Sequence, residues 1–265
     1  MNIVVCIKQV PDTTDARFDP QTGLLRREGQ PATLNALDEY AVEEGLRLRE
    51  KLGGGTVTAL TMGPPQAVEA LRHCVAMGAD EAVLLTDSAL AGSDAPATVY
   101  ALSRALVKMG PPDLILCGAE SADGATACVG PGLARALNLP CVTFVRKIES
   151  IDPACGKAVV QRIMEEGYDR LEIDLPAVLT VVKEINEPRI SSLKGKMRAR
   201  KYEPKQIAAA DLDGATPDRL GLQGSAARVV RTFAPEARPA GVMLEGEPDE
   251  VAAKLYDNLK KIGAI

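Results

Sequence analysis

The chain has 265 residues, of which 46 % are apolar and 25 % charged, and its formal net charge at pH 7 is -5. This balance is typical of a folded domain with a sizeable core, and the negative charge argues against general nucleic-acid binding. No apolar run approaches the roughly 18 residues of a membrane span. Met1 and Asn2 lead directly into an apolar segment without a basic leader. We therefore expect a soluble, cytoplasmic protein.

Histidine and cysteine usage excludes several kinds of site. The single histidine, His73, cannot form a histidine metal cluster, and its place beside an apolar stripe favours a structural or surface role. The six cysteines include no CxxC pair and no zinc or iron–sulfur spacing. Glu165 and Glu166 resemble a catalytic carboxylate pair, but a solvated turn is the simpler interpretation. We therefore predict reduced thiols, no metal site and no catalytic residue.

Strand and helix signals alternate in chain order through the first half of the chain. Apolar runs without helical period predict buried strands over residues 2–8, 56–62, 81–85, 113–118 and 141–145. Between them, apolar residues recur near helical spacing over residues 37–52, 65–77, 94–109 and 129–137. This βαβα alternation predicts an α/β fold with a mainly parallel, doubly wound, Rossmann-like sheet.

The chain changes character after residue 150. Residues 157–182 predict a hairpin followed by a further strand, so we assign residues 1–188 to one α/β nucleotide-binding domain. Residues 189–205 are basic and helix-poor, which fits either a solvated loop or a docking surface for an acidic protein. Residues 206–265 contain one amphipathic helix, beginning at Pro248, and little else to bury. We expect them to form an arm that packs on another chain.

The strongest local signal is the small, glycine-rich segment 118–132, between a buried strand and a helix. Its backbone N–H groups could hold phosphate, although a tight strand–helix turn is the simpler alternative. Asp123 could accept from a ribose hydroxyl or cap the helix. Arg135 occupies the last position of a would-be GxGxxG motif, and no P-loop occurs. The missing P-loop argues against an ATP-using enzyme of this architecture.

Two segments resemble the beta subunit of electron-transfer flavoproteins. Residues 160–171, followed by 176–180, resemble the family signature, with Asp169 where the signature prefers Glu or Gln. Residues 186–193 and 196–201 resemble the recognition loop that docks onto partner dehydrogenases. The chain is identified on these residues as a member of that family, and hence as an electron carrier.

The resemblance implies a heterodimer with an alpha subunit that holds one FAD, while this subunit holds a second adenine nucleotide. In ordinary members that nucleotide is a structural AMP. In a bifurcating subgroup it is a second FAD, which takes a hydride from NADH and sends electrons to a high-potential and a low-potential acceptor, such as ferredoxin or flavodoxin. Residues 4–13, 61–67, 123–131 and 220–225 resemble that subgroup.

Two positions depart from the subgroup. Ala125 and Cys128 stand where it usually has an acidic residue and Gln. We expect FAD in this subunit, with AMP as the alternative.

The resemblance also implies which residues contact the nucleotide and the partner. The expected cofactor-binding residues are Cys6, Asn35, Ala36, Leu37, Asp38, Met62, Gly63, Pro64, Asp123, Gly124, Ala125, Thr126, Ala127, Cys128, Val129, Gly130 and Pro131. The expected contacts with a dehydrogenase, such as an acyl-CoA dehydrogenase, are Arg189, Leu193, Lys194, Lys196 and Met197. Leu193 would be the apolar anchor among them.

Overall fold

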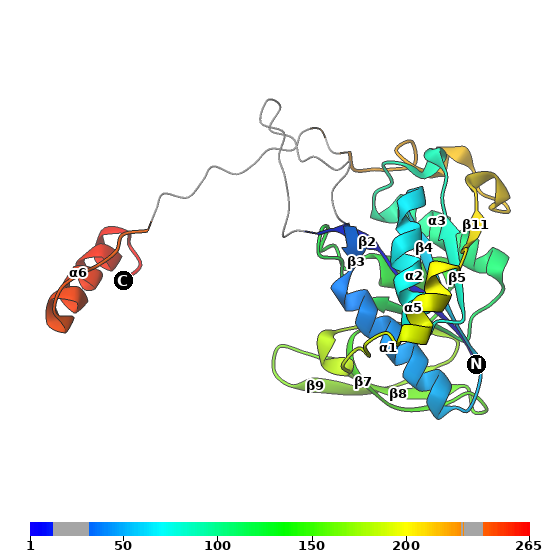
Figure 1. The fold of residues 1–265 in the computed structure, drawn as a ribbon, viewed down its shortest axis with the longest axis horizontal. Coiled ribbons are helices and arrows are strands. Elements are labelled where there is room, and N and C mark those ends of the chain that lie inside the picture. The colour runs from blue at the N-terminus through cyan, green and yellow to red at the C-terminus, as the bar shows by residue number, and fades with distance from the viewer. Residues whose placement is uncertain (13–31, 229, 231–240) are drawn as a thin grey trace.

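The computed structural model describes residues 1–12, 32–228, 230 and 241–265 (Figure 1). Its centre is a nine-stranded sheet in the order β11-β5-β4-β1-β6-β10-β7-β8-β9. The parallel strands include β1 (Asn2–Cys6), β4 (Thr56–Met62), β5 (Glu81–Leu85), β6 (Leu114–Gly118) and β10 (Ala177–Val181). The predicted alternation of strands and helices is confirmed here, because each apolar run forms a strand, and the strands β1, β4, β5 and β6 are buried along most of their length.

The far side of the sheet is antiparallel. β7 (Cys141–Asp152) runs parallel to β10, and β8 (Lys157–Ile163) and β9 (Tyr168–Asp174) then fold back in turn. The predicted hairpin is confirmed, with Ile163 opposite Tyr168 at its tip. β7 is longer than the predicted 141–145 because it continues as the partner of β8. The sheet is therefore mixed rather than uniformly parallel.

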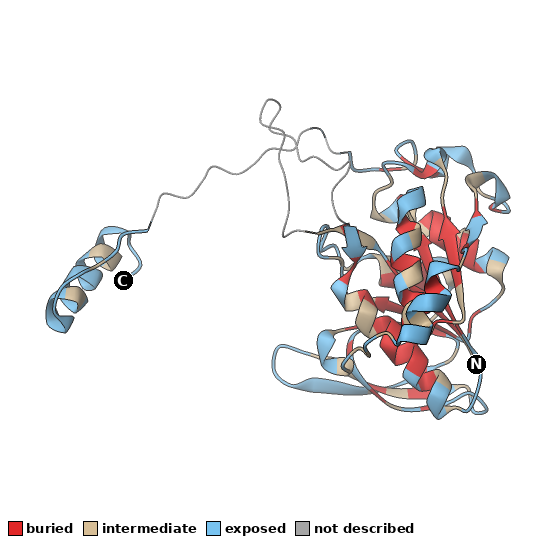
Figure 2. Cartoon of the chain, viewed as in Figure 1, coloured by how far each residue is buried: buried red, intermediate tan, exposed pale blue. Residues whose placement is uncertain are grey.

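Helices cover both faces of the parallel strands. Successive residues of a strand point to opposite faces, so Ile3 and Val5 join one buried cluster while Val4 and Cys6 join another. The first cluster packs under α1 (Ala36–Lys51) and α2 (Val68–Met77), and the second under α3 (Ala95–Met109) and α4 (Val129–Leu137). Figure 2 shows the buried layer between these helices and the sheet.

Short elements complete the domain. β2 (Gln9–Pro11) and β3 (Ala32–Leu34) form a separate antiparallel ribbon that the sequence did not predict. The 3-10 turns η2 (Pro65–Ala67), η3 (Ser88–Leu90), η4 (Lys183–Ile185), η5 (Ala209–Asp211) and η6 (Pro217–Arg219) lie in the connections. In the described part of the chain, no helix has the length and apolar character needed to cross a membrane.

The basic segment 189–205 is not helix-poor, which corrects the sequence interpretation. It forms α5 (Leu193–Arg200), which Ser192 caps by accepting from Gly195 N at 3.0 Å. α5 packs closely on α2, and a Cβ at Gly195 would overlap the carbonyl of Ala76. The sequence did not predict α5 because the helix has almost no apolar stripe. The Ser192 N-cap and the close packing of Gly195 on α2 stabilise it instead.

The packed domain also extends further along the chain than predicted. β11 (Lys205–Ile207) pairs in parallel with β5 at the edge of the sheet. Leu212, Leu220 and Ser225 are buried, so the residues up to Ser225 belong to the α/β domain and not to an arm. α6 (Pro248–Lys261) has no buried residue. Its packing on a second chain stays a prediction.

Candidate nucleotide-binding site

A cavity of about 990 Å³ lies beyond the carboxyl ends of β1, β4, β5 and β6. In the sheet, β4 and then β5 lie on one side of β1, while β6 lies on its other side. The direction in which successive strands are added therefore reverses between β1 and β6. Ligands of open α/β sheets bind in the crevice at such a switch point. The cavity lies at the upper end of the roughly 300–1,000 Å³ range of small-molecule sites.

Most of the predicted cofactor-binding residues line this cavity. They are Cys6, Asn35, Asp38, Met62, Gly63, Pro64, Asp123, Gly124, Thr126, Ala127, Cys128, Val129 and Gly130. The other four, Ala36, Leu37, Ala125 and Pro131, are not among its lining residues. The topology therefore brings together segments that are far apart in the sequence, although contact with a nucleotide stays a prediction.

Asp38 joins the ends of the two central strands. Its carboxylate accepts from the backbone N–H of Lys8 at 2.7 Å and from that of Gly118 at 3.1 Å. Burial raises the pKa of Asp38 to about 7, against the lowering effect of these hydrogen bonds. A Cβ at Gly118 would overlap Asp38 Oδ1, so this junction requires glycine. The carboxyl group thus holds β1, β6 and the start of α1 together at the cavity floor.

Asn35, the N-cap residue of α1, also links two segments at the cavity through its side chain. Its Nδ2 donates to the carbonyl of Glu120 at 3.0 Å, and its Oδ1 accepts from Ala122 N at 3.0 Å. The amide thereby holds the first residues of the glycine-rich loop against the start of α1. Because the side chain is almost fully buried, the two bonds satisfy polar atoms that would otherwise be costly to bury.

The loop itself bends sharply before α4. Ala125 and Ala127 have φ values of 43° and 51°, which place both in the left-handed region that non-glycine residues rarely adopt. Such residues persist only where the surroundings hold them, and they cluster at ligand sites. At the start of α4, a Cβ on Gly130 would overlap the methyl group of Thr180. Close packing of α4 on β10 therefore depends on that glycine.

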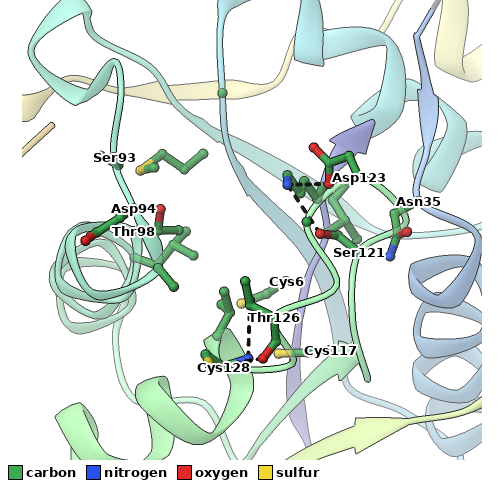
Figure 3. Close-up of a pocket in the computed structure, with 18 of the residues that line it drawn as sticks. Cys6, Asn35, Ser93, Asp94, Thr98, Cys117, Ser121, Asp123, Thr126 and Cys128 are labelled. Atoms are coloured by element: carbon green, nitrogen blue, oxygen red, sulfur yellow. Dashed lines mark hydrogen bonds and ion pairs between the residues drawn. The ribbon is translucent and has the colours of Figure 1, made fainter. Parts of the chain in front are cut away.

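Asp123 does not cap α4, and its carboxylate forms an ion pair with Lys8. The N-cap residue of α4 is Cys128, which makes no side-chain cap. Asp123 Oδ1 instead accepts from Lys8 Nζ at 2.6 Å, and Lys8 Nζ also lies 3.3 Å from Ser121 Oγ (Figure 3). Although partial burial alone would raise it, the Lys8 interaction holds the pKa of Asp123 below its usual value. The helix-capping alternative for Asp123 is thus corrected.

Sequence reasoning missed the opposite wall of the cavity, which consists of residues 86–88 and 90–95 with Thr98 and Leu102. Figure 3 shows Ser93, Asp94 and Thr98 across the cavity from Ser121 and Asp123. The position of these residues directly after β5 could have revealed them, because the ends of parallel strands meet at one edge of the sheet.

Asp94 attaches this wall to the end of the packed domain. Its Oδ1 caps α3 by accepting from Ala97 N at 3.0 Å. Its Oδ2 accepts from Ala226 N at 2.8 Å and Ala227 N at 3.0 Å, and its own N–H donates to Ser225 Oγ at 2.8 Å. The N-terminus of α3 and the segment that leaves the domain are therefore held by one carboxylate.

The cysteines at the cavity form no disulfide in the described structure. Cys6 and Cys117 are buried and lie in register on β1 and β6. The interaction with Cys6, together with burial, raises the pKa of the Cys117 thiol. Within the described ranges, no group of three His, Cys, Asp or Glu residues is placed to hold a metal ion.

The predicted docking residues lie on a separate surface around α5. Leu193 and Met197 are 77 % and 60 % exposed and stand one helical turn apart, and Lys194 and Lys196 are exposed beside them. Arg189 differs from these four because its guanidinium is paired within the chain, with Glu43 and Glu50.

A doubly wound α/β domain with a glycine-rich loop and a large cavity at its switch point has the architecture of nucleotide-binding proteins. A family model described as "Electron transfer flavoprotein domain" matches residues 22–212 of the chain.

Relatives match over a still greater length. The chain is 47 % identical over 260 residues to the "Electron transfer flavoprotein subunit beta" of Thermoanaerobacterium thermosaccharolyticum, covering 98 % of each chain. It is 45 % identical over 263 residues to the "Caffeyl-CoA reductase-Etf complex subunit CarD" of Acetobacterium woodii, also covering 98 % of each. It is 44 % identical over 243 residues to "Protein FixA" of Azotobacter vinelandii, covering 90 % of this chain and 85 % of that one.

The chain therefore belongs to the electron transfer flavoprotein family, as a beta subunit. The resemblance drawn from residues 160–171 and 186–201 is confirmed.

Proposed function

We propose that this subunit binds FAD in the strand-end cavity and works in a heterodimer with an alpha subunit that carries a second FAD. The extent of the cavity carries the proposal. The cavity, about 990 Å³ in volume, extends from the glycine-rich loop to residues 88 and 90–95, well beyond the residues expected to contact adenine and phosphate. A dinucleotide makes use of this additional space, whereas a mononucleotide leaves the wall at residues 86–88 and 90–95 without a role.

The lining fits the parts of such a ligand. The segment 123–131 runs into the first turn of α4, and its backbone N–H groups, which Pro131 lacks, suit phosphate. The backbone at Cys6 and the segment 35–38 would hold the adenine, and Asp123 or its neighbours the ribose. The remaining wall, with Met62, Pro64 and Leu90, offers apolar surface for a flat ring system.

When bound, FAD supplies hydride and single-electron chemistry, while the protein binds, orients and shields it. We assign to the complex the transfer of electrons between NADH or acyl-CoA-type dehydrogenases and other acceptors, including ferredoxin or flavodoxin, by electron bifurcation. One relative, CarD, is by its name part of a caffeyl-CoA reductase–Etf complex. That name supports a dehydrogenase-type partner for the present chain, with α5 as its docking surface.

A second candidate is a structural AMP, with redox chemistry confined to the alpha subunit. It is favoured by the clustering of polar groups at the ends of β1 and β6, where Asn35, Asp38 and Asp123 lie around a space that a mononucleotide could fill. Under this alternative the chain remains a structural partner in electron transfer.

The nucleotide content of the purified heterodimer decides between the two. Acid release followed by chromatography should give two FAD per heterodimer, and NADH should bleach the absorbance of both. One FAD and one AMP would replace the proposal with the second candidate. A heterodimer with a single adenine nucleotide, on the alpha subunit, would contradict both.

A further inference from the structure

The cavity is rich in carboxyl groups, an unusual setting for an anionic ligand. Asp38, Asp87, Asp94, Glu120 and Asp123 all line it, and among the described lining residues Lys8 is the one cation. A nucleotide brings one or more further negative charges, and like charges brought together in a partly buried site repel one another. Positive charge from the protein would therefore favour retention of the phosphates, in addition to the backbone N–H groups of the loop.

Backbone amides already compensate three of these carboxylates. Asp38 accepts from the backbone N–H groups of Lys8, just beyond β1, and of Gly118 in β6. Asp94 accepts from three backbone N–H groups, at α3 and residues 226–227, and Asp87 accepts from those of Ala89 and Ala209. These dipoles are turned toward the carboxylates and cannot serve a ligand at the same time. The ammonium group of Lys8 is the charged side chain that can.

The position of Lys8 is defined at both ends of its side chain. Its backbone N–H donates to Asp38, which fixes the root of the side chain at the end of β1. Its Nζ lies over the glycine-rich loop, 2.6 Å from Asp123 Oδ1 and 3.3 Å from Ser121 Oγ. The same nitrogen would lie 3.9 Å from a Cβ built on Gly124. The cation thus stands against the segment expected to hold phosphate.

The chemistry of an ammonium group leaves room for one more partner. It carries three N–H donors, and Asp123 and Ser121 account for two within the described residues. The side chain is 47 % exposed, so it can adjust without disturbing the core. Asp123 can therefore hold the ammonium in place while a further N–H points to a phosphate oxygen.

We propose that Lys8 supplies the positive charge that retains the nucleotide phosphates, with Asp123 as the group that positions it. This inference rests on the proposed nucleotide-binding function. Charge-assisted hydrogen bonds are roughly twice as strong as neutral ones, and ligand affinity responds tenfold to about 1.4 kcal/mol. We expect removal of the ammonium to weaken binding of phosphate-bearing ligands about ten- to hundredfold.

The test is calorimetric titration of the intact protein, stripped of nucleotide, with adenosine, AMP and FAD. Lys8→Met should weaken the affinity for AMP and FAD about ten- to hundredfold and change the affinity for adenosine by no more than about twofold. Lys8→Arg should retain most of the wild-type affinity for AMP and FAD. Lys157→Met is the matched control, because Lys157 is a half-exposed lysine paired with a carboxylate, Glu172, on β9. The Lys157→Met variant should bind adenosine, AMP and FAD with wild-type affinity.

A double variant separates the charge of Lys8 from its pairing with Asp123. If Lys8 only neutralised Asp123, Lys8→Met with Asp123→Asn would recover AMP affinity, and that recovery would overturn the inference. An equal loss for adenosine and AMP would also overturn it, since it would indicate a merely structural role.

Two further results separate this inference from the proposed function. A wild-type protein that binds neither AMP nor FAD would remove the proposed function and the inference together. Normal wild-type binding with unchanged Lys8→Met binding would reject the role of Lys8 alone.

Discussion

Arg189 Nε donates to the carboxylate of Glu43 at 2.7 Å, and the Glu43 side chain is only 3 % exposed. The terminal nitrogens of the same guanidinium donate to Glu50 at 2.6 and 3.1 Å. The segment before α5 is therefore fastened to α1, the helix whose first turn contributes Asp38 to the cavity lining. Although burial alone would raise it, the bonds from Arg189 and Arg47 hold the pKa of Glu43 below its usual value.

Removal of this guanidinium should release the docking segment from α1. Arg189→Met leaves the buried Glu43 carboxylate short of a partner, which we expect to cost about 1–3 kcal/mol of unfolding free energy, less than a fully buried pair because Arg189 is partly exposed. Electron transfer to the dehydrogenase should slow while nucleotide content stays constant. Denaturant unfolding and transfer kinetics measure the two effects.

The control for this prediction is Glu50→Gln. Glu50 is half exposed, so its loss should change stability by less than about 1 kcal/mol. Equal stability of Arg189→Met and the wild type would show that the ion pair does not hold the segment.

Leu193→Ala should slow electron delivery to the partner dehydrogenase at sub-saturating concentrations. Truncation of an apolar anchor typically costs about 2 kcal/mol or more of binding free energy. Nucleotide content should not change, because α5 packs on α2 and lies apart from the cavity lining. Charge reversal at Lys194 or Lys196 should give a weaker, salt-dependent defect. Unaltered transfer kinetics in Leu193→Ala would place docking elsewhere.

Two glycines of the loop should respond differently to alanine. A Cβ at Gly130 would overlap Thr180, and overpacking of this kind costs about 1–3 kcal/mol, so Gly130→Ala should lower both thermal stability and nucleotide content. A Cβ at Gly124 meets Ser121 Oγ at 3.4 Å, an ordinary contact, so Gly124→Ala should change neither. The bulkier Gly124→Val should lower nucleotide content alone. The reverse ranking would contradict the observed packing of α4 on β10.

Asp38 should make the unfolding free energy depend on pH between about pH 4 and pH 7. Its folded pKa of about 7 lies above the ordinary value of 3.8, so between these values the folded state binds the additional proton. The unfolding free energy should therefore fall as pH rises from about 4 to about 7, with a limiting slope near 1.4 kcal/mol per pH unit. Urea unfolding at several pH values should show that Asp38→Asn removes this component, whereas Asp213→Asn, at an exposed site, retains it. Equal slopes in Asp38→Asn and the wild type would exclude Asp38 as the source.

Deletion of residues 241–265 should separate assembly from folding. Because α6 has no buried residue, its loss should change the unfolding free energy of the α/β domain by no more than about 0.5 kcal/mol. Leu255, Tyr256 and Ile262 lose the partner that we expect them to meet on the alpha subunit. Size-exclusion chromatography should show a weakened heterodimer. A large loss of domain stability would indicate that α6 packs on this chain.

The local elements and the fold class follow from patterns in the amino-acid sequence alone. Apolar runs such as 56–62 and 81–85 and the helical stripe of α3 are patterns that extend over only a few residues. Asp94 and Gly110 mark where α3 begins and ends. Residues 118–132 indicated a phosphate loop for the same reason, because a strand–glycine–helix junction is a local pattern. Residue motifs were specific enough to indicate the family.

How these elements meet is defined by contacts between distant parts of the chain. No periodicity links Lys8 to Asp123, Arg189 to Glu43 or Asp94 to residues 226–227, since each pair is separated by more than a hundred residues. The polar helix α5 likewise depends on a cap and on the close approach of Gly195 to α2 rather than on an apolar stripe. Long-range polar contacts carry no local pattern, and they form only once hydrophobic burial has placed the strand ends side by side.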